Sequence, residues 1–378
     1  YQCYNLVSIK IPSTVTHIDD QAFSDSGLIS IIIPESVKYI GQHTFYNSNQ
    51  LLYVIFEGNS NISKYDIDTN QIFTHCDALR TVYCTQNTLT NWGLTAGPNE
   101  SVGGSRYQVN IIEYDVLLSG TGELANGGTV SYQASILIDG YTSIGQSAFQ
   151  TTYVGLVIIP NSVTSIGEYA FQNCQSLTSI TFTFEEYGQY PLLTSIGQSA
   201  FNSCSALTSI TIPRSVTSIG QSAFSNCQTL TSITIPDLVT FIDQYTFTSC
   251  LRLSSISIPE SVTSIGLSAF NGCSTLKEIT IPNSVTFIGQ NAFLGTQLST
   301  TYNSDGLILW YVPTDTTSFS FSSGPSIIGS YALSNTNVTS VSIPDSVTSI
   351  GQYAFYNCQA LTSISIPYSV TSIGQYAF

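Results

Sequence analysis

Apolar and polar residues follow one another in a unit of 23 residues that recurs along most of the chain. Evenly spaced prolines mark this period: Pro213, Pro236, Pro259 and Pro282, then Pro344 and Pro367. The consensus of one unit reads S-V-T-S-I-G-Q-x-A-F-x-x-C-x-x-L-T-S-I-T-I-P-x. Its Ala-Phe element recurs, with substitutions, at Phe23, Phe45, Phe149, Phe171, Phe201, Phe224, Phe247, Phe270, Phe293, Leu333, Phe355 and Phe378, and a looser unit centres on Phe73. Self-similarity at such a period predicts a solenoid in which each unit forms one coil.

Two short extended segments are predicted in each unit. The segment L-T-S-I-T-I, for example at Leu207 to Ile212, has the L-x-x-L-x-L spacing of a leucine-rich repeat, and its last four residues alternate as in a strand. The proline that follows has no N–H for a ladder and ends the strand. The segment V-T-S-I then forms a second short strand, after which a glycine such as Gly220 is expected at positive φ.

The stretch Q-S-A-F-S-N-C is too short for an independent helix, so we expect one helical or 3-10 turn that directs Phe and Cys inward. A single coil cannot bury its Phe, Leu and two Ile, whereas coils stacked about 4.8 Å apart share one continuous core. The predicted fold is therefore a β-rich leucine-rich-repeat solenoid, built from 23-residue coils with short parallel strands and short helical or 3-10 turns.

Interruptions of the period predict how the chain is divided. Between about 96 and 110 the chain carries the turn-rich text G-P-N-E-S-V-G-G-S, which is typical of a linker, and we place the linker at 99–110. We therefore expect one leucine-rich-repeat array over residues 1–98, the C-terminal part of a first solenoid, and a second array over residues 111–378. Insertions in the second array are predicted at 182–191 and at 295–326.

Charged residues are scarce and mostly acidic. Eight Lys and Arg stand against 23 Asp and Glu, giving a formal charge of −15. Without a basic cluster, nucleic acids and anionic membrane surfaces are excluded as partners, because both require cations that neutralise phosphate. Charged residues make up 8% of the chain, against about 25% in average domains, so Ser, Thr, Asn and Gln supply most of the polar surface. Such a surface suits an extracellular or cell-surface protein.

No run of about 18 apolar residues occurs, so we expect no membrane insertion by this segment. The sequence contains no Met and starts and stops within a repeat. We therefore expect it to be a fragment of a longer protein, with any export signal or anchor outside it.

The coil text V-T-S-I-G-Q-S-A-F-S-N-C-Q-T-L-T-S-I-T-I-P, from Val216 to Pro236, resembles the BspA-like leucine-rich repeat family, also called the Treponema-type repeat. The resemblance covers most of the chain, and the segment S-G-T-G-E-L after Leu118 is similar to one that often precedes arrays in that family. It implies a secreted or surface protein that adheres to host proteins and cells, and binding in place of catalysis. The family has no motif for a shared ligand, so the resemblance assigns no functional residue.

Eight of the nine cysteines share one position in the coil, three residues after the core Phe or its equivalent: Cys3, Cys76, Cys174, Cys204, Cys227, Cys250, Cys273 and Cys358. No C-x-x-C pair accompanies them, so we predict a stack of small buried thiols and no metal or redox site. Parallel side chains stacked in register do not converge easily, and we therefore expect free thiols. A bridge between Cys76 and Cys84 is the alternative.

No catalytic, cofactor-binding or metal site is predicted. The three histidines, His17, His43 and His75, belong to different coils and have no Ser or carboxylate at the spacing of a triad or of a zinc site. We therefore expect a protein that is not an enzyme and that needs no cofactor.

One surface of the strands is the candidate binding site. Nine hydroxyl residues are expected to form columns on it, and we call this set the hydroxyl face: Thr208, Ser209, Thr211, Thr231, Ser232, Thr234, Ser254, Ser255 and Ser257. Lys277 and Glu278 interrupt the columns. One interpretation is that small polar residues keep a regular ladder soluble, and the other is a repetitive contact surface for a protein or glycan ligand.

Three sequons, at Asn61, Asn99 and Asn337, lie in or beside irregular segments and are candidate glycosylation sites. The preferred hypothesis is an adhesion protein with a protein or glycan partner. The alternative is a structural protein whose copies join end to end into a filament or coat, because chain ends within a coil would expose edge strands.

Overall fold

The computed structural model describes residues 3–6, 9, 11–51, 53–58, 62, 67–68, 70–79, 81–92, 97–100, 109–114, 116–127, 134–182, 192–321 and 324–378. The chain divides into two compact units. The N-terminal unit contains the described residues up to Leu118 together with Ala134–Leu137, and the C-terminal unit contains the other described residues up to Phe378. Within these ranges, no helix has the length and apolar character needed to cross a membrane.

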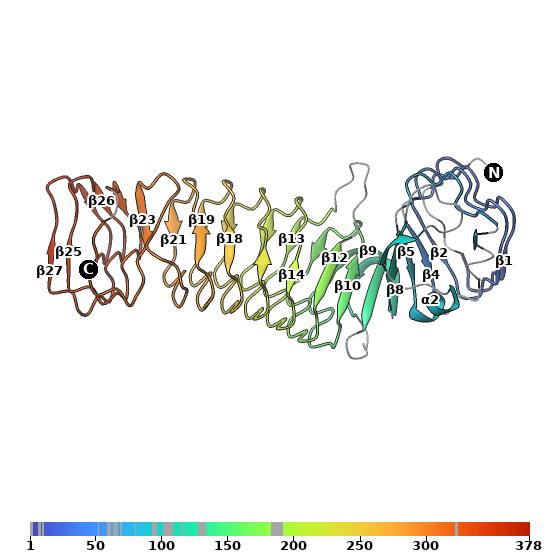
Figure 1. Ribbon diagram of the computed structural model, residues 1–378, viewed down its shortest axis with the longest axis horizontal. Helices are drawn as coiled ribbons and strands as arrows, with labels where there is room; N and C mark the ends of the chain where they lie inside the picture. Colours follow the sequence, from blue (N-terminus) through green and yellow to red (C-terminus); the bar gives the residue numbers. More distant parts are fainter. Residues whose placement is uncertain are drawn as a thin grey trace. The chain divides into compact units, whose positions relative to one another are not determined.

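The N-terminal unit consists mainly of parallel strands (Figure 1). The pair β1 (His17–Ile18) and β3 (Tyr39–Ile40) is parallel. The other sheet has the order β2 (Ser30–Ile33), β4 (Tyr53–Phe56), β5 (Thr81–Cys84), β7 (Val109–Glu113), β6 (Gly97–Glu100). Helix α2 (Gln86–Trp92) follows β5.

The predicted linker at 99–110 overlaps two of these strands. Its first residues belong to β6 and its last to β7, and β6 and β7 pair antiparallel. Residues 101–108 lie outside the described part of the chain. The division into two arrays at this linker stays a prediction.

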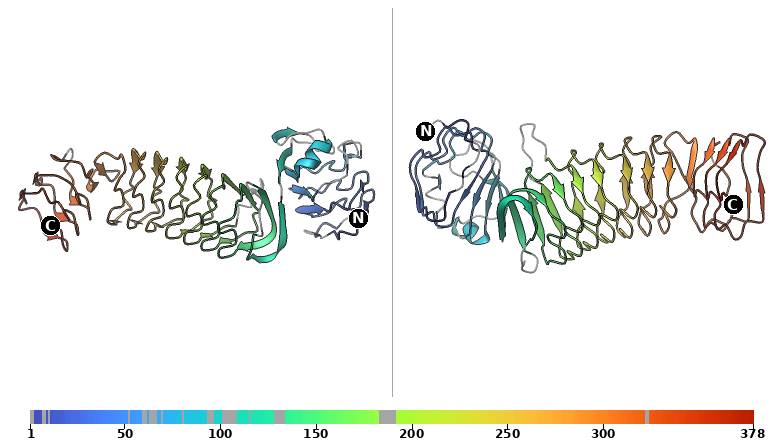
Figure 2. Two further views of the ribbon diagram at one scale, coloured as in Figure 1. Left: turned by 90° about the horizontal axis from the view of Figure 1, so that it is seen from below. Right: turned by 180° about the vertical axis from the view of Figure 1, so that it is seen from behind.

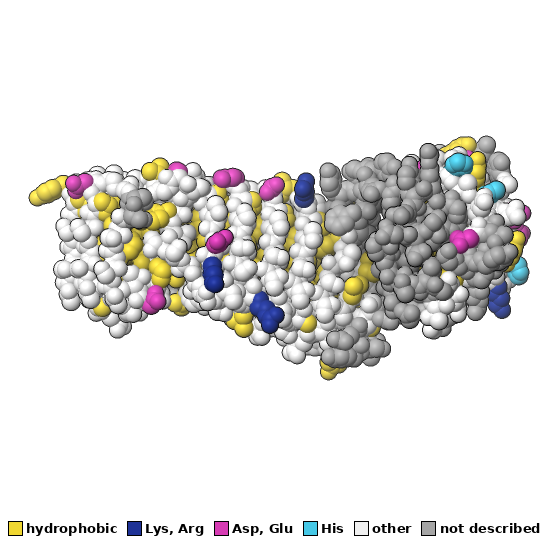
Figure 3. Space-filling model, in the orientation of Figure 1, with side chains coloured by type: hydrophobic (Ala, Val, Ile, Leu, Met, Phe, Trp, Pro, Cys, Tyr) yellow, Lys and Arg dark blue, Asp and Glu magenta, His cyan; other side chains and the backbone are white. Residues whose placement is uncertain are grey.

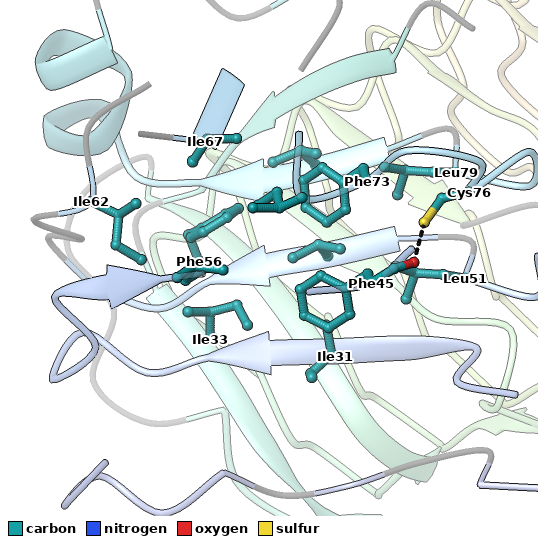
Figure 4. Close-up of a cluster of buried hydrophobic side chains, with 14 of the residues drawn as sticks. Ile31, Ile33, Phe45, Leu51, Phe56, Ile62, Ile67, Phe73, Cys76 and Leu79 are labelled. Atoms are coloured by element: carbon teal, nitrogen blue, oxygen red, sulfur yellow. Dashed lines mark hydrogen bonds between the residues drawn. The ribbon is translucent and has the colours of Figure 1, made fainter. Parts of the chain in front are cut away.

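The core of the N-terminal unit is built from stacked side chains of successive coils (Figure 4). The ring of Phe45 stacks on that of Phe23, with centroids 5.5 Å apart, and on that of Phe73, at 5.6 Å. Phe73 therefore belongs to the same stack, as the looser unit in the sequence predicts. Trp92 of α2 closes this core edge-on against Phe56, at 5.0 Å.

The C-terminal unit stacks its coils in a row (Figures 1 and 2). Two long strands, β8 (Val116–Leu124) and β9 (Ser135–Ile144), pair with each other ahead of the regular coils. The L-T-S-I-T-I segments form β10 (Leu156–Ile159), β12 (Ser179–Phe182), β14 (Ser209–Ile210), β16 (Ser232–Ile233), β18 (Ser255–Ser257), β20 (Glu278–Thr280), β25 (Ser340–Ser342) and β27 (Ser363–Ser365). The V-T-S-I segments form β11 (Ser165–Ile166), β13 (Ser195–Ile196), β15 (Ser218–Ile219), β17 (Phe241–Ile242), β19 (Ser264–Ile265), β21 (Phe287–Ile288), β24 (Ile327–Ile328), β26 (Ser349–Ile350) and β28 (Ser372–Ile373).

Pairing between these coils is parallel and in register, so that Ser209 lies opposite Ser232. The phenylalanines from Phe149 to Phe293 stack face to face, with neighbouring centroids 4.9 to 5.8 Å apart. A column of this kind buries every ring on both faces, which a single coil cannot do. The prediction of a leucine-rich-repeat solenoid with short parallel strands is confirmed.

The segment after each V-T-S-I strand differs from the predicted helical or 3-10 turn. In residues 220–227 three N–H groups donate to the carbonyl three residues earlier, those of Ala223, Ser225 and Cys227. However, Ser222 and Asn226 have φ of 57° and 60°, which no right-handed helix allows. The segment is therefore a run of overlapping β-turns. This geometry leaves alternate N–H groups free to donate to the next coil, as Phe224 does to Thr246 at 3.0 Å.

The glycine before these turns has a different role from the predicted one, because positive φ occurs two residues later, at Ser222. A Cβ on Gly220 would instead lie 2.7 Å from the backbone N of Gln198 in the preceding coil. Asp19 and Asp243 take this place in two coils, so a side chain is accommodated where the neighbouring coil can give way. The glycine serves close packing of coils, and not a left-handed turn.

At Gly329 the neighbour cannot give way. A Cβ there would lie 2.3 Å from Cε3 of the buried Trp310 ring and 2.8 Å from the Leu309 carbonyl oxygen. We expect Gly329→Ala to lower the free energy of unfolding by about 3 kcal/mol, as overpacking does. The matched control is Gly306→Ala, at φ +75° with nothing within 4 Å, which should cost about 1 kcal/mol through its left-handed backbone alone. Urea unfolding of both variants tests this, and equal losses would contradict it.

Candidate functional site

The structure places all nine residues of the hydroxyl face on the surface of the C-terminal unit. Strands β14, β16 and β18 position them, because successive side chains of a strand point to opposite sides. The alternate residues Ile210, Ile233 and Ile256 are buried, with exposed fractions of 4%, 7% and 6%. The hydroxyl side chains therefore lie on the exposed side of strands whose other side packs into the core.

The hydroxyl groups of this face have almost no partners within the protein. Among the described residues, we find one such bond, from Thr231 Oγ1 to the Thr208 carbonyl oxygen at 3.2 Å. The other eight hydroxyl groups make no hydrogen bond to the described part of the chain. They are free to donate to and accept from a ligand.

A second row of hydroxyl residues behaves differently. On the V-T-S-I strands, seven threonines donate the Oγ1 proton to a backbone carbonyl of the preceding coil, at 3.0 to 3.2 Å. We call this row the threonine ladder, and its donors are Thr164, Thr194, Thr217, Thr263, Thr286, Thr348 and Thr371. Its hydroxyl protons are already used between coils. The two rows thus share a composition but differ in what they offer a partner.

Charged side chains around the hydroxyl face are few, and the same coils expose Arg214, Asp237, Arg252 and Glu260. Lys277 and Glu278 are both exposed, and Glu278 lies opposite Ser255 in the register of β18 and β20. They replace the hydroxyl groups of two columns in the next coil, whereas Thr280, opposite Ser257, continues the third. The face shown in Figure 3 is mostly uncharged, with isolated acidic and basic side chains. Recognition here would rest on hydrogen bonds and shape.

Of the eight cysteines in the repeated position, Cys3 is exposed and Cys358 is half-buried, whereas the other six are buried, and all nine cysteines of the chain are free. We call the seven from Cys76 to Cys358 the thiol column. Each thiol of the column donates to the carbonyl of the core residue one coil earlier, at 2.9 to 3.2 Å, as Figure 4 shows for Cys76 and Phe45. Burial raises the pKa of Cys174 to about 11 and that of Cys227 to about 12. These thiols therefore link coils and are poor nucleophiles. The prediction of free thiols is confirmed, and the alternative bridge between Cys76 and Cys84 is wrong.

Two histidines that the sequence assigns to different coils come together on the N-terminal unit. The rings of His43 and His75 lie edge-on to Tyr46, with centroids 5.6 and 5.3 Å away. Stacking of coils brings them to one surface, which their separation in sequence conceals. In the described ranges no three His, Cys, Asp or Glu residues are grouped as metal ligands.

Two of the three candidate glycosylation sites cannot be placed. Asn61 and the side chain of Asn99 lie outside the described residues, as does nearly all of the predicted insertion at 182–191. Asn337 is exposed, next to the buried Val338. Of the three sequons, Asn337 therefore has a described setting open to modification.

The irregular stretch at 295–326 creates a feature that the sequence analysis did not identify. It forms an antiparallel pair, β22 (Thr301–Tyr302) with β23 (Ile308–Tyr311), and β23 then joins β24 in parallel. Beside it lies an open hollow of about 460 Å³, lined by Asn291, Leu294, Thr314, Asp315, Asn335 and Asn337. The signal in the sequence is the wide spacing between Phe293 and Leu333, which marks the place but does not reveal the cavity.

Comparison with known protein families agrees with this architecture. The model of the BspA-type leucine-rich repeat region matches in six copies, over residues 1–96, 131–190, 194–308 and 311–378. The chain belongs to the BspA-type leucine-rich repeat family. Its fold and family are those of repeat proteins that are generally not enzymes. Among curated proteins, no sequence matches this BspA-type chain.

Several solved structures are similar to the BspA-type chain. A leucine-rich repeat protein from Bacteroides ovatus is 26% identical over 68% of this chain and 84% of its own, with a TM-score of 0.39. A leucine-rich cell surface protein from Faecalibacterium prausnitzii is also 26% identical, over 76% of this chain and 84% of its own, with a TM-score of 0.33. A leucine-rich repeat protein from Treponema pallidum is 24% identical, over 58% and 78%, with a TM-score of 0.32.

Proposed function

We propose that this BspA-type protein is extracellular or attached to a cell surface, and that it adheres to a protein or glycan partner through the hydroxyl face. The observation that carries the proposal is the contrast between the two hydroxyl rows. The threonine ladder uses its protons between coils, whereas eight hydroxyl groups of the hydroxyl face have no partner in the described part of the chain. A surface that served solubility alone would not need this difference.

Two further features support the proposal. The family's members are typically secreted or surface proteins, and the scarcity of charge leaves recognition to many weak hydrogen bonds. Each such bond contributes only about 0.5–1.5 kcal/mol net, so affinity would require several coils to engage one partner together. A rigid row of coils provides that arrangement without a cost for ordering the surface.

The hydroxyl face is tested by placing charge on it. In the variant carrying Thr211→Lys, Thr234→Lys and Ser257→Lys, we expect binding to fall at least about tenfold, because three long cations cover the columns and disturb their hydrogen bonding. Thermal unfolding should change little, since all three side chains are exposed. Binding would be measured on arrays of immobilised extracellular matrix proteins and glycans.

The matched control carries the same three charges on the threonine ladder, as Thr164→Lys, Thr194→Lys and Thr217→Lys. These positions are also exposed and lie in adjacent coils of the same unit. The proposal expects the control to keep its binding. Equal loss in both variants, or no loss in the first, would show that the hydroxyl face is not the contact surface.

A further inference from the structure

The hollow beside residues 295–326 arises because one coil lacks the repeated run of β-turns. In the regular coils each run donates N–H groups to the next, and the last bond of this series goes from Gly272 to the Leu294 carbonyl at 2.7 Å. The irregular coil keeps one such bond, from Val312 to the Ala332 carbonyl at 2.8 Å, and the full series resumes with Tyr331, which donates to Gln352 at 3.1 Å. Between them the Tyr311 ring takes up part of the space, edge-on to Phe293 at 5.6 Å. The remaining space is the hollow.

The hollow is lined by polar side chains, most of which have no hydrogen-bond partner in the described part of the chain. One amide bond crosses it, from Asn335 Nδ2 to Asn291 Oδ1 at 3.2 Å. The side chains of Thr314, Asp315 and Asn337 also face the hollow, and none of them has a side-chain hydrogen bond to the described part of the chain. The lining therefore offers a hydroxyl, a carboxylate and an amide to a ligand, with Leu294 as an apolar contact.

A buried donor provides a second, independent sign of a ligand site. A narrow cavity of about 20 Å³ shares Asn291, Leu294, Thr314 and Asn335 with the hollow, and Trp310 lines its inner wall. Trp310 is only 4% exposed, and its Nε1 has no hydrogen-bond partner. A buried N–H without a partner is costly, and a space of this size holds one oxygen atom. Trp310 thus contributes a buried N–H without a partner to the wall of a cavity that shares four residues with the hollow.

We propose that this hollow binds one neutral hexopyranose unit of a glycan. Sugar hydroxyl groups both donate and accept hydrogen bonds; an amide side chain can do both in return, and a carboxylate accepts from them. The hollow of about 460 Å³ is open to solvent, so it can admit one end of a glycan chain. No Lys or Arg lines the hollow, and Asp315 would repel an acidic sugar. The site is separate from the hydroxyl face and does not depend on its function.

The test titrates the whole chain with methyl glycosides of glucose, galactose and mannose and with N-acetylglucosamine. The protein is made without N-glycosylation, because Asn337 both lines the hollow and begins a sequon. Binding is measured by calorimetry and by the fluorescence of Trp310 in a Trp92→Phe background, since the chain contains two tryptophans. We expect saturable binding of at least one probe, with a Kd on the order of 1 mM for so small a ligand.

Variants then locate the binding. Asp315→Asn and Asn337→Ala are exposed changes that leave the core intact, and each should weaken binding about tenfold. Trp310→Phe removes the indole N–H and should weaken it several-fold. Asp345→Asn, an exposed carboxylate elsewhere in the C-terminal unit, is the matched control and should leave the Kd unchanged.

Three results would overturn the proposal. The first is that none of the four neutral probes binds saturably. The second is binding that Asp315→Asn and Asn337→Ala leave unchanged. The third is equal or tighter binding of the methyl glycoside of sialic acid, since the acidic lining predicts that an anionic sugar binds less well.

Discussion

Replacing Phe247 by Ala is expected to lower the free energy of unfolding of the C-terminal unit by about 3–5 kcal/mol. Phe247 is completely buried, and its ring stacks between those of Phe224 at 5.8 Å and Phe270 at 5.3 Å. Removing it leaves a cavity that two rigid neighbouring coils cannot close. The substitution also removes the ring contacts to the coils on both sides, and the stability of a solenoid depends on such contacts between neighbouring coils.

Urea unfolding followed by circular dichroism would measure this loss. The matched control is Phe241→Ser in the same coil. Phe241 is 42% exposed, and the neighbouring coil has serine in its place, Ser264. We expect the control to cost less than about 1 kcal/mol, as for a surface substitution. A loss for Phe247→Ala no greater than that of the control would show that the ring stack does not hold the coils together.

The sequence predicts this stack well because the physical constraint is periodic. Each core residue packs against the equivalent residue of the next coil. The same side chain therefore fits in every coil, and Phe, Ile and Cys recur at the core positions. The free thiols, the parallel strands and the exposure of the hydroxyl face all follow from that repetition. The same reasoning places Phe73, whose coil departs from the consensus, in a stack with Phe45.

Two features could not be predicted from the sequence, because they depend on contacts between coils that require no particular residue type. The left-handed backbone at Ser222 and Asn226 is set by N–H groups that donate to the next coil, and local propensity favours a helical turn there. Likewise, the hydroxyl face and the threonine ladder differ in whether most of their hydroxyl groups donate to a carbonyl of the preceding coil. Thr211 and Thr217 are the same residue type, and only the structure separates their roles.

The hollow is unpredictable for a related reason. A break in the period shows that one coil is irregular, but not which part of it is missing. Here β23 pairs like a V-T-S-I strand, but the run of β-turns that should follow it is absent, and Tyr311 occupies only part of the space. An interruption of a repeat is thus the place where a solenoid gains a concave site.

Raising the pH above 9 is expected to destabilise the C-terminal unit steeply, because its buried thiols would have to ionise. Burial raises the pKa of Cys174 from 9.0 to about 11 and that of Cys227 to about 12, and it raises the pKa of Cys204 well above 9.0. Above pH 9 the unfolded chain loses these protons while the folded chain keeps them, so the unfolded state is favoured. The stability is fully present below pH 9 and is lost progressively as the pH approaches 11 to 12.

The expected slope is about 1.4 kcal/mol for each pH unit and each thiol, or roughly 4 kcal/mol per unit for these three together. Urea unfolding between pH 8 and 10.5 under reducing conditions would measure it. The variant Cys227→Ala should be less stable at pH 8, because it loses a buried hydrogen bond to Phe201, yet its stability should fall less steeply above pH 9. The control for removal of a thiol is Cys3→Ala, because Cys3 is exposed and lies outside the thiol column. If Cys227→Ala and the parent chain lost stability in parallel, ionisation of the thiol column would not be what limits the fold at alkaline pH.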